Sequence, residues 1–102
     1  MNEIKLGKQE IIHFVGIGGI GMSGLAQIMK TMGFKVQGSD VNKNKNTENC
    51  KNLGIKIFKD KKRKNVSKAT ILVKSSAINI SNLEILEAKK KNIPIYDRVE
   101  ML

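Results

Sequence analysis

The stretch HFVGIGGIGMSG, residues 13–24, places five glycines between a mostly apolar run and a helical pattern. Three of them, Gly16, Gly18 and Gly21, have the spacing G-x-G-x-x-G. At this spacing the first glycine allows a tight turn, the second lets the backbone approach a diphosphate, and the third lets helix and strand pack closely. The stretch therefore predicts a strand, a turn and a helix that bring the backbone close to a phosphate group.

Short apolar runs alternate with helical patterns along the whole chain. The runs that predict strands are Ile11–Val15, Phe34–Gly38, Ile55–Phe58, Thr70–Lys74 and Ile93–Tyr96. Strands separated by helical stretches of about 10 to 15 residues favour βαβ units with right-handed crossovers. We expect one α/β domain over residues 1–102, an open parallel sheet of about five strands with helices on both faces.

Three helices are expected between these strands. The first has an apolar stripe at helical spacing, which consists of Met22, Leu25, Ala26, Ile28, Met29 and Met32. The second is a weak helix near Thr47–Leu53. The third begins at SNLE, where Ser81 and Glu84 have the spacing of a capping box, and turns Leu83, Leu86 and Ile85 toward the core.

In parallel sheets ligands bind beyond the carboxyl ends of the strands, which directs attention to the loops there. Asp40 follows the second strand, about 20 residues after the glycine motif, where an acidic residue can accept hydrogen bonds from a ribose. Ser75 and Ser76 follow the fourth strand and offer hydroxyl groups to the same edge. The alternative is that the glycines serve packing alone and that Asp40 and the serines are ordinary turn residues. His13 lies inside a strand, which favours a structural role.

Composition limits the other classes of function. The net charge of +10 suggests nucleic-acid binding, but of 19 basic residues only Arg63 and Arg98 are arginines, and the chain has one Tyr, three Phe and no Trp. The dense run KDKKRK, residues 59–64, is therefore expected to be a solvated loop or short helix, with no nucleic acid as partner.

The single cysteine, Cys50, excludes an internal disulfide and fits a reducing compartment. No run approaches the ~18 apolar residues of a membrane span, so a cytoplasmic protein without a membrane partner is expected.

Four blocks in order resemble the N-terminal domain of the Mur ligase family: IHFVGIGGIGMSGLA (residues 12–26), GSD (38–40), SSAI (75–78) and IPIYDRVEML (93–102). The resemblance implies a Rossmann-like domain that binds the UDP part of UDP-N-acetylmuramate. It implies that Gly18–Gly21 lie along the diphosphate, that Asp40 faces the uridine, and that Ser75 and Ser76 line the same crevice. The binding residues that it implies are Gly16, Gly18, Gly19, Ile20, Gly21, Met22, Ser23, Asp40, Ser75, Ser76 and Ala77.

The resemblance also implies an activity for the full-length enzyme, in peptidoglycan biosynthesis. ATP with Mg²⁺ activates the muramoyl carboxylate as an acyl phosphate, which the amine of L-alanine attacks. Because these steps belong to a central ATPase domain and a C-terminal domain, residues 1–102 are expected to bind substrate without catalysing, and to hold no catalytic residue, metal or cofactor.

Two alternatives remain within related chemistry: the sister ligase that reattaches murein tripeptide, and a small NAD(P)-binding domain. Asp60 and Lys61 stand where relatives often have Gly-His, and Asn82-Leu83-Glu84 stands where they often have Asn-Pro-Glu. The first departure leaves in doubt the role of the histidine that relatives have at this position. The second is expected to change only the start of the third helix.

Overall fold

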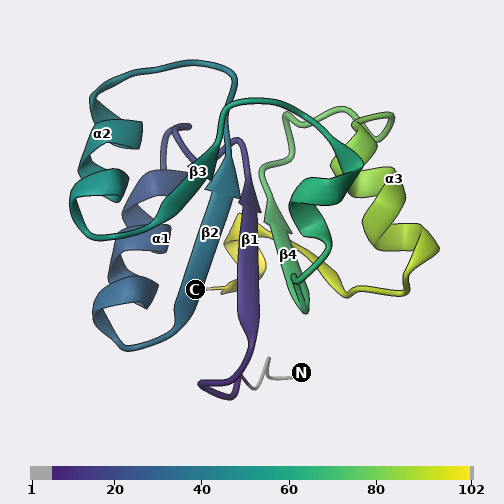
Figure 1. Ribbon diagram of the computed structural model, residues 1–102, viewed down its shortest axis with the longest axis horizontal. Helices are drawn as coiled ribbons and strands as arrows, with labels where there is room; N and C mark the ends of the chain where they lie inside the picture. The colour runs from purple at the N-terminus through teal and green to yellow at the C-terminus, as the bar shows by residue number, and fades with distance from the viewer. Residues whose placement is uncertain (1–5, 102) are drawn as a thin grey trace.

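The computed structural model describes residues 6–101 of the chain. Its elements follow one another in the alternating order that the sequence predicts (Figure 1). They are β1 (Ile11–Val15), α1 (Met22–Thr31), β2 (Lys35–Ser39), α2 (Lys45–Asn52), β3 (Lys56–Phe58), the 3₁₀ helix η1 (Arg63–Val66), β4 (Ile71–Lys74), α3 (Leu83–Lys90), β5 (Ile95–Asp97) and the 3₁₀ helix η2 (Arg98–Met101).

The five strands form one sheet in the order β3-β2-β1-β4-β5, and every pairing is parallel. The predicted α/β fold is confirmed. From β1 the chain moves first to β2 and β3 on one side and then to β4 and β5 on the other. Strand order thus reverses between β1 and β4, and the loops that follow these two strands open a crevice of the kind in which open sheets bind ligands.

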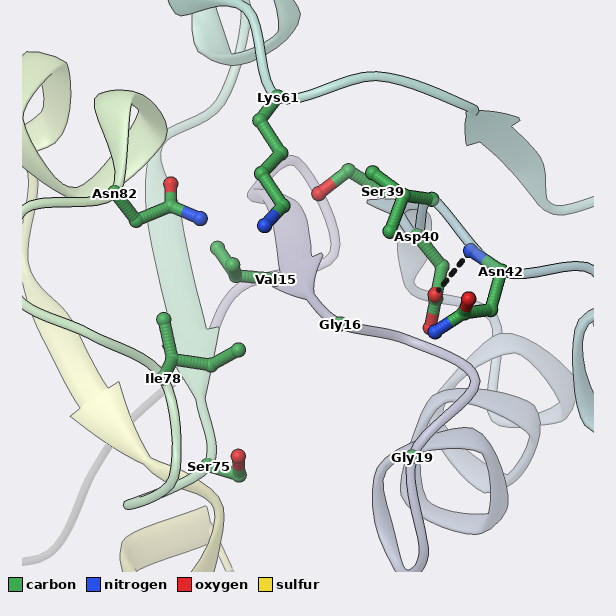
Figure 2. A pocket seen from close by; sticks show the side chains of 11 residues that line it. Val15, Gly16, Gly19, Ser39, Asp40, Asn42, Lys61, Ser75, Ile78 and Asn82 are labelled. Atoms are coloured by element: carbon green, nitrogen blue, oxygen red, sulfur yellow. Dashed lines mark hydrogen bonds between the residues drawn. The ribbon is translucent and has the colours of Figure 1, made fainter.

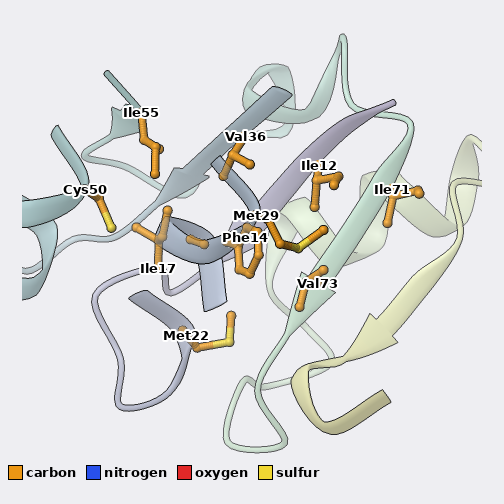
Figure 3. Packing of buried hydrophobic residues seen from close by; sticks show 11 residues of the cluster. Ile12, Phe14, Ile17, Met22, Met29, Val36, Cys50, Ile55, Ile71 and Val73 are labelled. Carbon is orange, nitrogen blue, oxygen red and sulfur yellow. The ribbon is translucent and has the colours of Figure 1, made fainter. Parts of the chain in front are cut away.

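Successive residues of β1 point to opposite faces of the sheet, as the pleat requires. Ile12 and Phe14 pack under α1 and α2 with Met22 and Met29, the larger core cluster (Figure 3). Val15 packs on the other face against Ile85 of α3 and Val66 of η1. Helical segments therefore cover both faces, with α1 and α2 at one side of the molecule and α3 and η1 at the other (Figure 1).

The start of α3 differs from the prediction. Asn82, not Ser81, is the N-cap, and its side chain accepts hydrogen bonds from the amides of Glu84 and Ile85. The carboxylate of Glu84 does not reach back to the cap but is fully buried. Of the residues expected to face inward, Ile85 is buried while Leu83 and Leu86 are exposed. The helix is rotated because Glu84, rather than a leucine, occupies a buried position next to β1.

Two smaller differences concern the other helices. In α1 the buried stripe consists of Met22, Ala26 and Met29, whereas Ile28 and Met32 are exposed. Helix α2 begins earlier than expected because Asn44 and Thr47 form a capping box. The lysine-rich run, residues 59–64, is exposed apart from the half-buried Asp60 and leads into the short helix η1, as the sequence predicts.

Candidate functional site

The glycine loop is joined to the end of β2 by its backbone. The amides of Gly16 and Ile17 donate to the carbonyl oxygen of Ser39, at 2.8 and 3.0 Å. Gly16 and Gly21 have φ angles of +73° and +79°, a conformation that favours glycine, and Gly21 is the N-cap of α1. The predicted tight turn between strand and helix is therefore present.

Position 18 requires glycine because neighbouring side chains of the same chain leave no room for a Cβ atom. A Cβ atom there would lie 2.7 Å from Thr47 Cγ2 and 2.8 Å from Asp40 Oδ2. The Gly18 amide donates to Asp40 Oδ2 (2.8 Å), while Oδ1 accepts from the amide of Asn42 (2.9 Å). The close approach predicted for the second glycine is thus made by Asp40, which clamps the glycine loop and at the same time lines the crevice.

One cavity of about 260 Å³ lies between the loops after β1, β2 and β4 (Figure 2). It brings together four predicted site residues, Gly16, Gly19, Asp40 and Ser75. Its remaining lining residues are Val15, Ser39, Val41, Asn42, Lys61, Ile78 and Asn82. Its volume is below the roughly 300–1,000 Å³ of pockets that enclose a drug-sized ligand, so it suits one part of a larger molecule. We call it the Asp40 cavity.

A second cavity of about 460 Å³ lies on the other side of Gly19 and Ser75, which line both. It holds four further predicted residues, Ile20, Met22, Ser76 and Ala77, and is completed by Asp97, Arg98 and Val99. We call it the Arg98 cavity. Gly18, Gly21 and Ser23 are absent from both linings: the first two shape the loop and Ser23 is buried in α1.

Several lining residues were not predicted. Asp97 is the last residue of β5 and Arg98 follows it, so the rule that pointed to the ends of β1, β2 and β4 could have found both. Lys61 lies three residues after the end of β3, so the same rule could have found it, whereas Asn82 lies eight residues after the end of β4. Figure 2 shows the side chains of Lys61 and Asn82 directed into the Asp40 cavity.

Positive charge gathers beside the glycine loop. The Arg98 side chain packs against Gly21, where an added Cβ would lie 2.9 Å from its Nε atom. The first turn of α1 contains no acidic residue, and the positive end of its dipole faces the same place. Lys74, by contrast, is paired with Asp97 at 2.8 Å. The arrangement favours an anion that lies along the loop.

Next to the Asp40 cavity, behind Ser39, lies a cluster of buried polar side chains: His13, Ser39, Asn65 and Glu84. The carboxylate of Glu84 accepts from His13 Nε2 (2.8 Å) and Ser39 Oγ (2.6 Å) on Oε1, and from Asn65 Nδ2 (2.7 Å) on Oε2. His13 and Glu84 are both fully buried. The structural role predicted for His13 is confirmed, and its partner is the residue predicted to cap α3.

Three groups elsewhere have shifted pKa values. The hydrogen bond from Asn65 lowers the pKa of Asp60, and the hydrogen bond from Arg63 lowers the pKa of Glu87. Burial raises the pKa of the Cys50 thiol.

Among residues 6–101 no cluster of three His, Cys, Asp or Glu side chains has the geometry of a metal site. Nor does any helix in that range have the length and apolarity needed to cross a membrane.

Comparisons with known proteins agree on one family. The model of the Mur ligase family, catalytic domain, matches residues 11–102. The chain is 64% identical over 100 residues to a UDP-N-acetylmuramate–L-alanine ligase of Pelagibacter ubique, which covers 98% of this chain and 22% of the relative. It is 53% identical over 90 residues to the ligase of the same name from Aquifex aeolicus, covering 88% and 20%.

Solved structures give the same result. The UDP-N-acetylmuramate-alanine ligase of Thermotoga maritima matches with a TM-score of 0.83 and 37% identity, over 87% of this chain and 21% of that one. A UDP-N-acetylmuramate:L-alanyl-gamma-D-glutamyl-meso-diaminopimelate ligase from Neisseria meningitides matches with a TM-score of 0.79 and 26% identity, over 87% and 28%. The chain thus spans about a fifth of the length of the curated relatives that it matches.

Proposed function

The chain belongs to the Mur ligase family, and from that membership we propose that it is the UDP-N-acetylmuramate-binding part of a ligase that joins L-alanine to this substrate. The Pelagibacter and Aquifex relatives carry that activity in their names. In the proposed enzyme this part binds the nucleotide sugar, and other parts of the protein bind ATP and the amino acid.

The observation that carries the proposal is the meeting of two cavities at Gly19 and Ser75. A UDP-sugar has a nucleoside at one end, a sugar at the other and a diphosphate between them. The diphosphate would lie along residues 18–21 at the N-terminus of α1, where Arg98 adds a positive charge. The nucleoside would then occupy the Asp40 cavity, and the sugar would extend into the Arg98 cavity.

The described residues do not fit ATP or Mg²⁺. Phosphoryl transfer needs a lysine that cradles the phosphates and oxygen ligands that hold the metal. The glycine loop of this chain continues Gly21-Met22-Ser23 without a lysine, and no group of acidic side chains converges near it among residues 6–101. In the proposed ligase, ATP with Mg²⁺ activates the substrate carboxylate outside this part of the protein, so no catalytic step is assigned to residues of this chain.

A second candidate is the ligase that attaches a murein tripeptide to the same nucleotide sugar. The structural likeness to the Neisseria enzyme favours it, although both the identity and the TM-score are lower than for the Thermotoga enzyme. The two candidates share the nucleotide sugar and differ in the amine that is joined. Assaying the full-length ligase with L-alanine and with the tripeptide separates them.

Calorimetric titration of the 102-residue chain tests the binding proposal. We expect saturable binding of UDP-N-acetylmuramate and none, or far weaker binding, of NADH. A preference for NADH would instead identify a dinucleotide-binding domain. Binding of DNA or RNA at low ionic strength, where lysine-driven affinity is highest, would favour a third class of function.

A further inference from the structure

Two leucines that the sequence predicts to lie in the core are instead on the outward side of α3. Leu83 and Leu86 are 44% and 37% exposed, and Ile80, three positions before Leu83, is 68% exposed. The buried side of the helix is filled by other residues, which are Glu84, Ile85 and Ala88. The folded chain therefore leaves apolar surface in contact with water along the outside of this helix.

Basic side chains border the exposed leucines. Lys89 and Lys90 are exposed in the last turn of α3. They take part in no ion pair among residues 6–101. The half-buried Glu87 is paired with two bases at once, Arg63 of η1 at 3.1 Å and Lys91 at 3.6 Å. Positive charge therefore exceeds negative charge around the apolar side chains.

Helical spacing brings the apolar and basic side chains onto one surface. Leu83, Leu86 and Lys90 are three or four positions apart, so they follow one line along the helix. This helix lies at the side of the molecule away from α1 and α2 (Figure 1). We call this surface the α3 face, and it consists of Ile80, Leu83, Leu86, Lys89, Lys90, Lys91 and Arg63. Apolar side chains bordered by lysines are typical of helices that lie in the interface of a bilayer.

We propose that the α3 face binds the anionic surface of a lipid bilayer. The leucines and Ile80 enter the boundary between headgroups and acyl chains, and the basic groups contact the lipid phosphates. Lysine suits this position, because its apolar stem can lie along the leucines while its ammonium group reaches the phosphates. Such a contact is peripheral and needs no long apolar run, which is the criterion behind the expectation of no membrane partner. It goes beyond the proposed function and does not depend on it.

The composition of the α3 face favours a bilayer over other anionic partners. A nucleic acid would attract the bases through its phosphates, but binding of that kind gives the exposed leucines no apolar surface to contact. A specific protein partner needs about 800 Å² of complementary surface on each side, far more than three apolar side chains supply. A fluid bilayer rewards apolar burial and positive charge together and requires no matching shape.

Sedimentation of the 102-residue chain with lipid vesicles tests the proposal. We expect binding to vesicles of phosphatidylglycerol mixed with phosphatidylcholine, weaker binding as the NaCl concentration rises, and little binding to phosphatidylcholine alone. The double variant Leu83→Ser and Leu86→Ser should bind the mixed vesicles about tenfold or more weakly, because the apolar contribution is lost. Its matched control is Ile28→Ser with Met32→Ser, which changes two exposed apolar residues of α1 and should keep the affinity.

A second pair of variants tests the charges of the α3 face. Lys89→Glu with Lys90→Glu should weaken binding to the mixed vesicles about tenfold or more. Lys43→Glu with Lys45→Glu makes the same change of net charge at exposed positions near the start of α2 and should have a much smaller effect. Circular dichroism checks that each variant is folded, and the two pairs of variants are read independently.

Three results would overturn the proposal. The first is no binding to the mixed vesicles at low ionic strength, where the attraction is strongest. The second is binding that the leucine variant leaves unchanged, together with equally tight binding of DNA, since charge alone would then explain the affinity. The third is equal weakening by the variants of the α3 face and by their controls. None of these results bears on the binding of a UDP-sugar, which is measured separately.

Discussion

The Asp40 carboxylate accepts a hydrogen bond from the Gly18 amide at 2.8 Å, so the residue after β2 holds the loop after β1. The same carboxylate lines the Asp40 cavity. The shape of the proposed diphosphate site therefore depends on contacts within the chain that are in place before any ligand arrives, and this preorganisation reduces the entropy that binding must overcome.

Gly18→Ala is predicted to lower the free energy of unfolding by about 1–3 kcal/mol, because the new methyl group overlaps Asp40 and Thr47. Gly24→Ala is the matched control. No atom lies within 4 Å of a Cβ at Gly24, which sits on the exposed side of α1, so alanine should stabilise the helix by up to about 1 kcal/mol. Urea denaturation measures both. Equal stability of the two variants would mean that the Gly18–Asp40 contact is not a constraint.

Arg98→Ala is predicted to weaken UDP binding by about tenfold or more, as expected for loss of a charged hydrogen-bond partner of a phosphate. Lys35→Ala removes the same charge at the exposed beginning of β2, the opposite end of the sheet from the crevice. That control should leave the dissociation constant nearly unchanged. If both variants weaken binding to the same extent, only overall charge matters and the assigned role of Arg98 is wrong.

Cys50 is predicted to react slowly with thiol reagents in the folded protein. The side chain is fully buried, and burial raises the pKa of its thiol, so little reactive thiolate is present at neutral pH. Ellman's reagent should label one thiol per chain rapidly in guanidinium chloride and only slowly in buffer. Complete labelling of the native protein within the mixing time would contradict the buried position of Cys50 in α2.

Stability is predicted to fall at acidic pH, in part because the carboxylates of Asp60 and Glu87 become protonated. Both pKa values are lowered in the folded protein, by hydrogen bonds from Asn65 and Arg63 respectively. A lowered pKa stabilises the folded state above the ordinary pKa, and this stabilisation is lost as pH falls through the folded value. Thermal melts between pH 6 and pH 3 (roughly the range in which ordinary carboxyl groups begin to titrate) should show a shallower decline for the double variant Asp60→Asn and Glu87→Gln. An unchanged slope would argue against both hydrogen bonds.

The fold could be predicted from the sequence because its signals are local. Five apolar runs and the glycine spacing are enough to indicate a parallel sheet, and the loops after β1, β2 and β4 follow from the rule about carboxyl ends. Eight predicted residues line the two cavities. Gly18, Gly21 and Ser23 line neither cavity, and their contact with a ligand stays a prediction, because spacing alone does not tell whether a glycine adjoins a ligand or a side chain.

The buried cluster could not be predicted, because its members are far apart in the sequence. Glu84 follows a cap-forming residue and is separated by 71 positions from His13, to which it binds. At that location a glutamate normally caps its own helix and faces solvent. Glu84 becomes a buried partner of Ser39 only because the folded chain brings the start of α3 next to β1 and β2. With Glu84 turned inward, Leu83 and Leu86 of the same helix are exposed.

The central claim is that one UDP-sugar spans the two cavities that meet at Gly19 and Ser75. Titrating the ¹⁵N-labelled chain with UDP-N-acetylmuramate, and following each backbone amide by NMR, tests it most directly. The account predicts the largest shifts at Gly19–Met22, Ser75–Ala77 and Arg98, with little change along Lys45–Asn52 of α2. Shifts confined to the lysine-rich run at residues 59–64, or absent from the glycine loop, would contradict it.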